Sequence, residues 1–166
     1  MSFKTHLNRR LLLFIGFIAT AVLVIITAVV FFSPQRGKRI TLRDSSSGRL
    51  YAQFPAEDNS TFSIEFVHSV NQTPVKDIFS ISSYMIRPVE TVFFTFGAGM
   101  QTDLADGQIL TYHDDGSMSI TGFDSNFDQL HYIVGTVSDH VFRINDTQIS
   151  LRDLCGRNTA ITIKIE

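Results

Sequence analysis

Residues 62–77, with the sequence FSIEFVHSVNQTPVKD, contain the pattern that decides the fold of this chain. From Phe62 to Phe66, apolar residues alternate with small or charged ones, and this period of two is typical of a strand with one buried face. The alternation places His68 on the apolar face, at the far end of the strand. A small polar segment follows, and Pro74 restricts the backbone where the next strand begins. The stretch therefore predicts two strands joined by a stiff polar loop.

His68 and Asp77 are the side chains of this stretch that suit chemistry best. A histidine at a strand end is suited to bind a ligand or to transfer a proton, with Asp77 as its partner. The competing interpretation is a buried imidazole that hydrogen-bonds the backbone or Asp77 and locks the loop. We favour the second, because the stretch supplies neither a nucleophile nor a second metal ligand. Ser69 does not form a catalytic pair with His68, since neighbours on a strand point to opposite faces.

Segments with the strand pattern continue to the end of the chain, and none shows a helical period. Turn-forming residues separate many of these segments. The predicted strands are residues 40–44, 49–54, 62–68, 78–84, 89–96, 108–113, 117–121, 130–136, 140–145, 148–151 and 160–165. Short strands with turns at this spacing predict an all-β fold, either an antiparallel β-sandwich or a flattened barrel.

Three phenylalanines lie close together in the predicted strand 89–96, at Phe93, Phe94 and Phe96. At least one ring must lie on each face of that strand, so we expect the strand to be covered on both sides. Gly97 and Gly99 follow it and favour a bulge, a bend or a close backbone approach.

The N-terminal region predicts a membrane anchor. Residues 1–10 are a short basic leader, and residues 11–32 form an apolar run of 22 residues without a charge. A helix of this length spans about 33 Å, enough for a hydrocarbon core of about 30 Å. We interpret the run as an uncleaved transmembrane signal anchor, residues 33–39 as a linker and residues 40–166 as the β domain. The small residues Ala19 and Ala21 leave a cleaved signal peptide as the alternative.

Charge is divided unevenly along the chain. Residues 40–166 hold all 16 acidic residues and eight of the 14 basic ones, a formal charge of −8. Such an acidic domain argues against nucleic-acid binding through phosphate neutralisation. Basic residues flank the apolar run almost evenly, but long domains cross membranes largely regardless of such charges. We therefore expect the N-terminus inside and the β domain exported.

No cofactor or metal site is expected from the sequence. Asp124, Asn126 and Asp128 have the opening spacing of a calcium loop, but Gln129 replaces the required glycine and Gly135 stands where the bidentate glutamate belongs. The single cysteine, Cys155, rules out an intrachain disulfide and a cysteine-rich zinc site. We predict no catalytic residue.

Residues 62–81 and 89–100 resemble a bacterial domain-of-unknown-function family, numbered eighteen-fifty, whose pattern has His-Ser-Val, a Pro-Val step and a Gly-Ala-Gly turn. The matching positions here are His68, Ser69, Val70, Pro74, Val75, Asp77, Phe79, Gly97 and Gly99. Asn71 stands where an acid is common, and Met100-Gln101 replaces an apolar–proline step. The resemblance implies a small anchored or exported protein associated with TAXI-type TRAP transporters, and it implies no chemistry.

Three hypotheses follow for the function, of which the last is an envelope-structural domain that binds no ligand. The first is a non-enzymatic accessory of such a transporter, a single-pass protein of the bacterial cytoplasmic membrane whose β domain lies on the periplasmic side. Its expected partners are the membrane and the permease or solute-binding protein of the transporter. The second is a small metal-binding, ligand-binding or hydrolytic domain that uses His68 with Asp77. The candidate binding residues are His68, Ser69, Thr73, Pro74, Asp77, Gly97 and Gly99.

Overall fold

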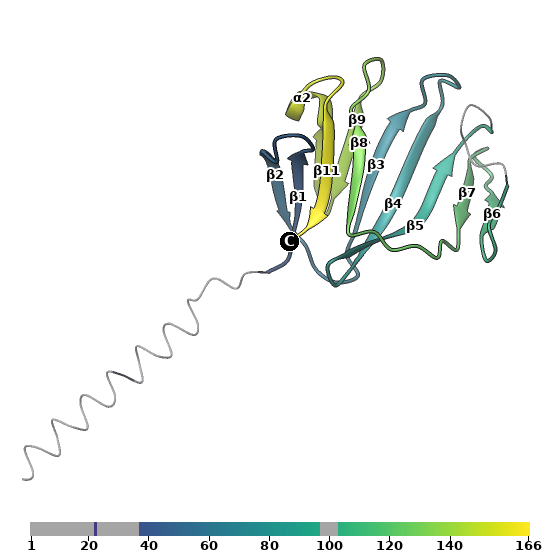
Figure 1. Ribbon diagram of the computed structural model, residues 1–166. Coiled ribbons are helices and arrows are strands. Elements are labelled where there is room, and N and C mark those ends of the chain that lie inside the picture. Colours follow the sequence, from purple (N-terminus) through teal and green to yellow (C-terminus); the bar gives the residue numbers. More distant parts are fainter. Residues whose placement is uncertain (1–21, 23–36, 97–102) are drawn as a thin grey trace, which may run out of the picture. The chain divides into compact units, whose positions relative to one another are not determined.

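Strands dominate the part of the chain that the sequence assigns to the β domain (Figure 1). The structure, a computed structural model, describes residue 22 and residues 37–96 and 103–166. Residues 37–96 and 103–166 contain eleven strands and one short helix, α2 (Leu151–Cys155). The strands are β1 (Arg39–Asp44), β2 (Leu50–Pro55), β3 (Thr61–Val67), β4 (Pro74–Ser82), β5 (Met85–Phe93), β6 (Ile109–Tyr112), β7 (Met118–Thr121), β8 (Gln129–Ile133), β9 (His140–Ile144), β10 (Thr147–Ser150) and β11 (Ala160–Ile165).

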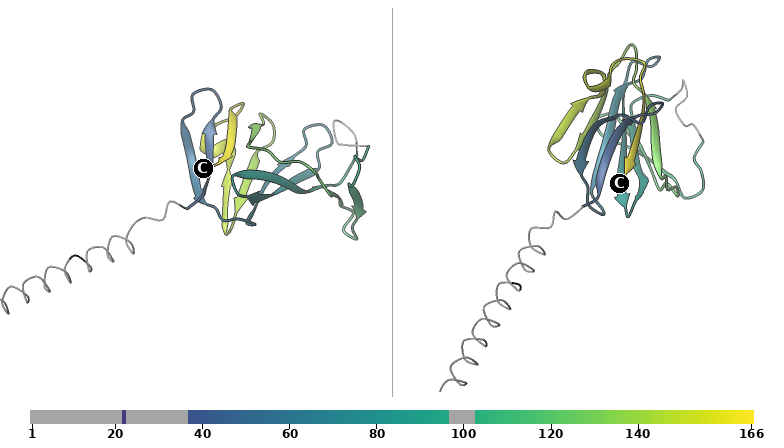
Figure 2. Two further views of the ribbon diagram at one scale, coloured as in Figure 1. Left: turned by 60° about the horizontal axis from the view of Figure 1, so that its bottom comes forward. Right: turned by 60° about the vertical axis from the view of Figure 1, so that its left-hand side comes forward.

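The strands form two antiparallel sheets. A small sheet has the order β2-β1-β11-β8, and a large sheet has the order β10-β9-β3-β4-β5-β7-β6. The small sheet lies in front of one half of the large sheet in Figure 1, and the large sheet continues beyond it toward β6 in Figures 1 and 2. The prediction of an all-β antiparallel sandwich is confirmed. The barrel alternative is not, because no strand pairing among the described residues joins the two sheets.

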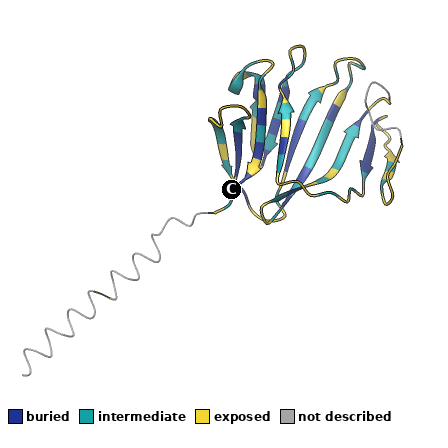
Figure 3. Cartoon of the chain, viewed as in Figure 1, coloured by how far each residue is buried: buried dark blue, intermediate teal, exposed yellow. Residues whose placement is uncertain are grey.

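The main core lies between the facing sheets. On β11, Ile161, Ile163 and Ile165 are buried while the residues between them are more exposed, as the alternating pattern predicts. From the large sheet, Phe62 and Phe142 meet at ring centroids 5.6 Å apart. Figure 3 shows buried segments on the strands of both sheets. The buried members of this cluster are Ile40, Leu42, Ala56, Phe62, Ile64, Phe79, Ile81, Ile86, Leu130, Val134, Phe142, Ile144, Leu151, Ile161, Ile163 and Ile165.

A second, smaller core forms toward the β6 end of the large sheet. Its buried residues are Val75, Phe93, Met118 and Ile120. Phe66 of β3 packs against both cores. This residue therefore links the part of the large sheet that faces the small sheet with the part that extends beyond it.

Three features of the observed strands differ from the sequence-based prediction. β3 ends at Val67, so His68 belongs to the loop, and β4 begins at Pro74 rather than at residue 78. β5 ends at Phe93, so Phe94 and Phe96 follow the strand and are partly exposed. The expectation that this strand is covered on both sides was therefore wrong.

The helix α2 was not predicted, because five residues are too few to show a helical period. It follows β10 directly, and its first turn is capped at Ser150, whose hydroxyl oxygen accepts a hydrogen bond of 2.9 Å from Asp153 N. Leu151 is fully buried in the main core, so this short helix closes one side of the sandwich.

The predicted leader and membrane anchor (residues 1–32, except Val22), most of the linker, Gly97 and Gly99 lie outside the described residues. In the part of the chain that the structure does describe, no helix has the length and apolar character needed to cross a membrane. The first strand begins one residue before the predicted strand 40–44, because Arg39 already exchanges two backbone hydrogen bonds with Glu166, at 2.7 and 2.8 Å.

Replacing Phe142 by alanine should lower the free energy of unfolding by about 3–5 kcal/mol, because the ring is fully buried and contacts Phe54 and Phe62. The matched control is Tyr112→Ala on the edge strand β6, where the ring is largely exposed and the expected change is within about 0.5 kcal/mol. Urea unfolding followed by the circular dichroism of the sheet measures both values. Equal losses in the two variants would contradict this placement of the core.

Candidate functional site

The loop from His68 to Thr73 is held mainly by its own backbone and by the His68 side chain. His68 N donates to Thr73 O and Gln72 N donates to His68 O, both at 2.9 Å. The imidazole Nδ1 accepts from Val70 N at 3.3 Å and from Asn71 N at 3.4 Å. Gln72 adopts a positive φ of 55°, which the closing turn requires. The imidazole therefore caps its own loop, as the structural interpretation of His68 expects.

Asp77 lies in the interior, away from the loop. It pairs with Ile64 in the β3–β4 register, and Ile64 is fully buried, so Asp77 points between the two sheets. Its carboxylate accepts from Thr91 Oγ1 at 2.9 Å and from Tyr132 Oη at 3.1 Å. Tyr132 belongs to β8 of the small sheet, so this hydrogen bond joins the sheets across the core.

The structure does not bring His68 and Asp77 together. His68 lies opposite Thr73, and Asp77 is four residues further along β4, about 14 Å at roughly 3.4 Å per residue. The hypothesis of a hydrolytic or metal-binding pair of His68 with Asp77 therefore has no geometric basis here. The reason is the hairpin register, which separates residues that are close in the sequence.

Burial dominates the electrostatics of Asp77. Desolvation raises the pKa of its carboxyl above the ordinary value of 3.8, although the hydrogen bonds from Thr91 and Tyr132 act in the opposite direction. Burial, together with the negative charge of Asp77, strongly raises the pKa of Tyr132. Tyr132 therefore remains a neutral donor, and the pair acts as a polar link inside an apolar core.

His68 of the loop shares a cavity with His140, the first residue of β9. A cavity of about 260 Å³ is lined by residues 66–69, residues 135–138 and His140. The two sides are joined by Ser138 Oγ, which donates to Val67 O at 2.6 Å. Gly135 is needed in the opposite wall, because a Cβ there would lie 2.5 Å from Ser138 O.

The imidazole of His140 accepts a hydrogen bond from a backbone N–H group, as that of His68 does. Its Nδ1 accepts from Gly135 N at 3.2 Å, and its ring stacks on Phe66 with centroids 4.8 Å apart. Desolvation lowers the pKa of His140, with a smaller lowering from Arg152, and the negative charge of Asp139 offsets part of this. Both imidazoles therefore accept hydrogen bonds from loop amides through Nδ1. No group of three or more histidine, cysteine or acidic side chains among the described residues is arranged to hold a metal ion.

The outer face of the large sheet, which points away from the small sheet, carries an apolar hollow beside the loop. This hollow of about 470 Å³ is lined by Val67 and Pro74, which flank the loop, and by Val92, Phe94 and Val141. No described strand or helix packs on this face. The loop and the hollow together form one surface, which we call the loop-end surface: residues 67–74 with Val92, Phe94, Val137 and Val141.

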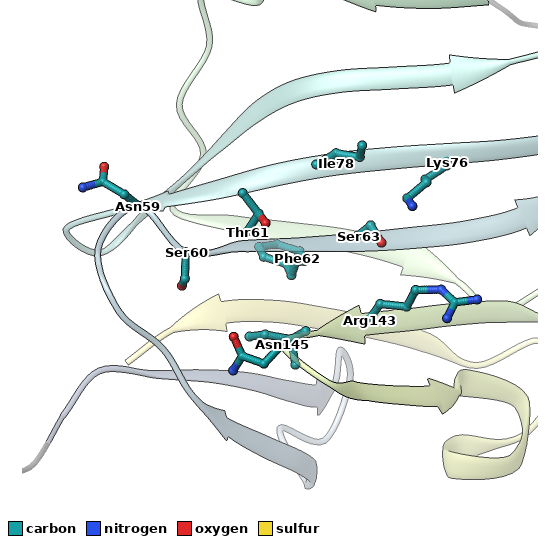
Figure 4. Close-up of a pocket in the computed structure, with 10 residues that line it drawn as sticks. Asn59, Ser60, Thr61, Phe62, Ser63, Lys76, Ile78, Arg143 and Asn145 are labelled. Atoms are coloured by element: carbon teal, nitrogen blue, oxygen red, sulfur yellow. The ribbon is translucent and has the colours of Figure 1, made fainter. Parts of the chain in front are cut away.

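A polar hollow of about 500 Å³ lies further along the same outer face (Figure 4). Lys76 and Arg143 lie on either side of Ser63 at one end of it, and Asn59 and Asn145 lie at the other. Glu65, beside them on β3, pairs with both cations: Lys76 Nζ lies 3.2 Å from Oε1 and Arg143 Nη2 lies 3.0 Å from Oε2.

Of the seven predicted binding residues, His68 and Ser69 line the cavity, and Pro74 lines the apolar hollow. Thr73 is tied to the chain after β5 by a 3.1 Å hydrogen bond to Thr95 Oγ1. Asp77 belongs to the core, and Gly97 and Gly99 lie outside the described residues. Among the five described members of this set, Asp77 therefore lies apart from the other four, which belong to the loop or flank it.

Sequence reasoning missed His140, Ser63 and Arg143. His140 joins the His68 cavity because β9 pairs with β3, placing Phe66 opposite His140, and Arg143 pairs with Ser63 in the same ladder. The sequence contains no local signal for this pairing, because the paired residues are 74 positions apart (Phe66 and His140) and 80 positions apart (Ser63 and Arg143). Only the alternation within β9 indicated which of its residues would face outward.

The fold and these surfaces define a class of protein: a β-sandwich domain with a self-capped histidine loop and an uncovered outer sheet face. Residues 62–151, more than half of the chain, match the family described as Domain of unknown function (DUF1850), and the chain belongs to that family. The match runs from Phe62 in β3 to Leu151, the first residue of α2, and includes the loop, the apolar hollow and the Ser63, Lys76 and Arg143 end of the polar hollow. No curated protein and no solved structure matches the chain.

Replacing Asp77 by asparagine should change how stability depends on pH. Because burial raises the pKa of Asp77 in the folded state, the wild type loses stability as the pH rises from 3.8 through that raised pKa. Asparagine has one acceptor oxygen and no charge, so it keeps one of the two hydrogen bonds and has no carboxyl group to ionise. The stability of the variant relative to the wild type should therefore rise as the pH increases. Urea unfolding from acid to neutral pH measures this difference.

Asp115→Asn is the control with the opposite sign. Hydrogen bonds from the hydroxyl and backbone N–H of Ser117 lower the pKa of Asp115 in the folded state. The ionised Asp115 therefore stabilises the fold above pH 3.8, and this stabilisation is lost as the pH falls through the lowered pKa. This variant should therefore fall behind the wild type as the pH increases. If Asp77→Asn also lost stability relative to the wild type as the pH increases, the ionised form of Asp77 would be stabilising. That result would overturn the assignment of Asp77 as a buried carboxyl with a raised pKa.

Proposed function

We propose that this protein is a non-enzymatic accessory of a TAXI-type TRAP solute transporter. In this proposal residues 11–32 anchor the chain in the bacterial cytoplasmic membrane, and the β domain contacts the permease or the solute-binding protein on the periplasmic side. Membership of the family supports the proposal. The proposal also rests on the resemblance given in the sequence analysis, which connects the His-Ser-Val and Pro-Val pattern with such transporters.

The observation that carries the proposal is the exposed apolar character of the loop-end surface. Val70 and Val137, on opposite sides of the His68 cavity, are 70% and 72% exposed, and both are held on ordered loops. Val67 and Phe94 add partly exposed apolar area around the hollow. An apolar patch that continues over several segments marks a site of interaction more often than single exposed residues do.

The loop is built to present this surface rigidly. His68 fixes the amides of Val70 and Asn71, and Ser138 fixes the strand end at Val67. On the other side, Arg152 Nη2 donates to Val137 O at 3.0 Å. A contact surface fixed before binding loses less conformational entropy when the partner docks. This assigns His68 the role of a positioning residue for a docking loop.

The membrane part of the proposal rests on the sequence. An uncharged run of 22 residues with basic residues on both sides is typical of a single-pass anchor. Anchoring would keep the β domain near a membrane partner, which raises its effective concentration and permits a weak contact to suffice.

Replacing Val70 and Val137 together by aspartate should reduce recovery of transporter subunits by about tenfold or more, because two charges would be placed in an apolar contact. The full chain is captured from membranes in mild detergent, and co-purified subunits are identified by mass spectrometry. His68→Ala should weaken recovery less, since it loosens the loop without removing its apolar side chains.

Ile133→Asp provides the matched control, because Ile133 is 66% exposed on the edge strand β8 of the small sheet. This variant should recover the subunits as the wild type does. Undiminished recovery with the double variant would remove the loop-end surface as the contact. Normal solute uptake in a strain that lacks the protein but retains the transporter would reject the accessory role itself.

A further inference from the structure

The strand register gathers an unusual set of polar groups on the outer face of β9, β3 and β4. Ser63 lies between Arg143 of β9 and Ile78 of β4, and the next outward-facing pair along the hairpin is Glu65 with Lys76. These neighbours form one end of the polar hollow in Figure 4. Three adjacent strands therefore supply one ammonium, one guanidinium and one hydroxyl group to the same spot.

This spot is locally positive in an acidic domain. The Glu65 carboxylate pairs with both Lys76 and Arg143, so these three side chains carry a formal charge of +1. Burial raises the pKa of Glu65, but hydrogen bonds from Lys76 and Arg143 outweigh this, so its pKa lies below the usual range. Glu65 is therefore ionised at neutral pH, as the formal charge of +1 assumes. Since residues 40–166 carry a formal −8, this charge stands out from its surroundings.

The cluster also retains hydrogen-bond donors. Lys76 has three N–H groups and, within residues 37–96 and 103–166, makes one polar contact, with Glu65 Oε1. Arg143 uses Nε and Nη2 on Glu65 and Nη1 on Gln148, which leaves one N–H on each terminal nitrogen. The Ser63 hydroxyl makes no hydrogen bond among the described residues, although the residue is only 7% exposed. These donors border the same hollow.

The other end of the hollow has neutral polar groups. Asn59 and Asn145 are turn residues with φ of 66° and 50°, and their side chains are exposed beside Thr61. Amide and hydroxyl groups both donate and accept, so they suit a ligand's hydroxyl groups. Charged donors at one end and neutral polar groups at the other specify a ligand with one anionic end and a hydroxylated body.

We propose that the polar hollow binds a small hydroxylated carboxylate. The carboxylate lies between Lys76 and Arg143 over the Ser63 hydroxyl, and the hydroxyl groups of the ligand face Asn59, Thr61 and Asn145. Glu65 orients both cations and, as a neighbouring anion, weakens binding. The proposed docking uses the apolar residues of the loop-end surface on the same face, and Lys76 lies at the border of the two hollows, since it lines both.

Gluconate is the probe that tests the proposal, with glucose and acetate as comparison ligands. Titration calorimetry on the full chain in detergent should show saturable gluconate binding, with glucose and acetate weaker by about tenfold or more, because each lacks one half of the recognised groups. No saturable gluconate binding up to about 10 mM would overturn the proposal. Equal binding of acetate or glucose would overturn the assigned ligand class.

Three variants locate the site. Lys76→Gln should weaken gluconate binding by about tenfold, while Glu65→Gln should strengthen it, because the first removes an attracting charge and the second a repelling one. Ser63→Ala should weaken binding severalfold and leave the unfolding transition unchanged, since its hydroxyl has no partner among the described residues. Lys164→Gln, on exposed β11 surface, should change nothing. Shifts of the same sign for Lys76→Gln and Glu65→Gln would indicate a structural role only and would overturn the site.

Discussion

The central position of β3 in the large sheet is the constraint on which both the core and the surfaces depend. β3 pairs with β4 on one side and with β9 on the other, so each of its residues has two fixed neighbours. Phe62, Ile64 and Phe66 consequently belong to the interior, and Ser63, Glu65 and Val67 to the outer face. A shift of the register by one residue would exchange these two sets, exposing the aromatic residues and burying the charges.

The polar link between Asp77 and Tyr132 has a different role from the apolar packing around it. Apolar contacts between sheets tolerate sliding, whereas a hydrogen bond from Tyr132 Oη to a buried carboxylate fixes one strand of the small sheet over β4. The raised pKa of Asp77 indicates that this position costs stability when the group is ionised. The link therefore favours one alignment of the two sheets over others of similar hydrophobic energy.

The sequence was sufficient to predict the strands, but not the contacts between distant strands. Alternation within single segments located all eleven strands to within a few residues, and the clearest pattern, Ile161 to Ile165, was predicted without error. Pairing across long separations, as of Phe66 with His140, leaves no local signal. The capping role of His68 depends on residues close to it in the sequence, and it agrees with the interpretation of His68 as a loop lock. Three features depend on distant strands and were not predicted: His140 in the same cavity, Asp77 in the core, and the cation cluster on the outer face.

The position of β11 has a consequence for how the domain folds. This strand, residues 160–165, lies between β1 and β8 in the small sheet and pairs with both. It joins β1, at the beginning of the β domain, to β8, which follows the first five strands of the large sheet in the sequence, and it supplies three isoleucines to the main core. Completion of the small sheet therefore depends on a pairing between segments far apart in the sequence, a kind of contact that slows folding. Deleting β11 would separate β8 from the β1–β2 hairpin instead of trimming an edge.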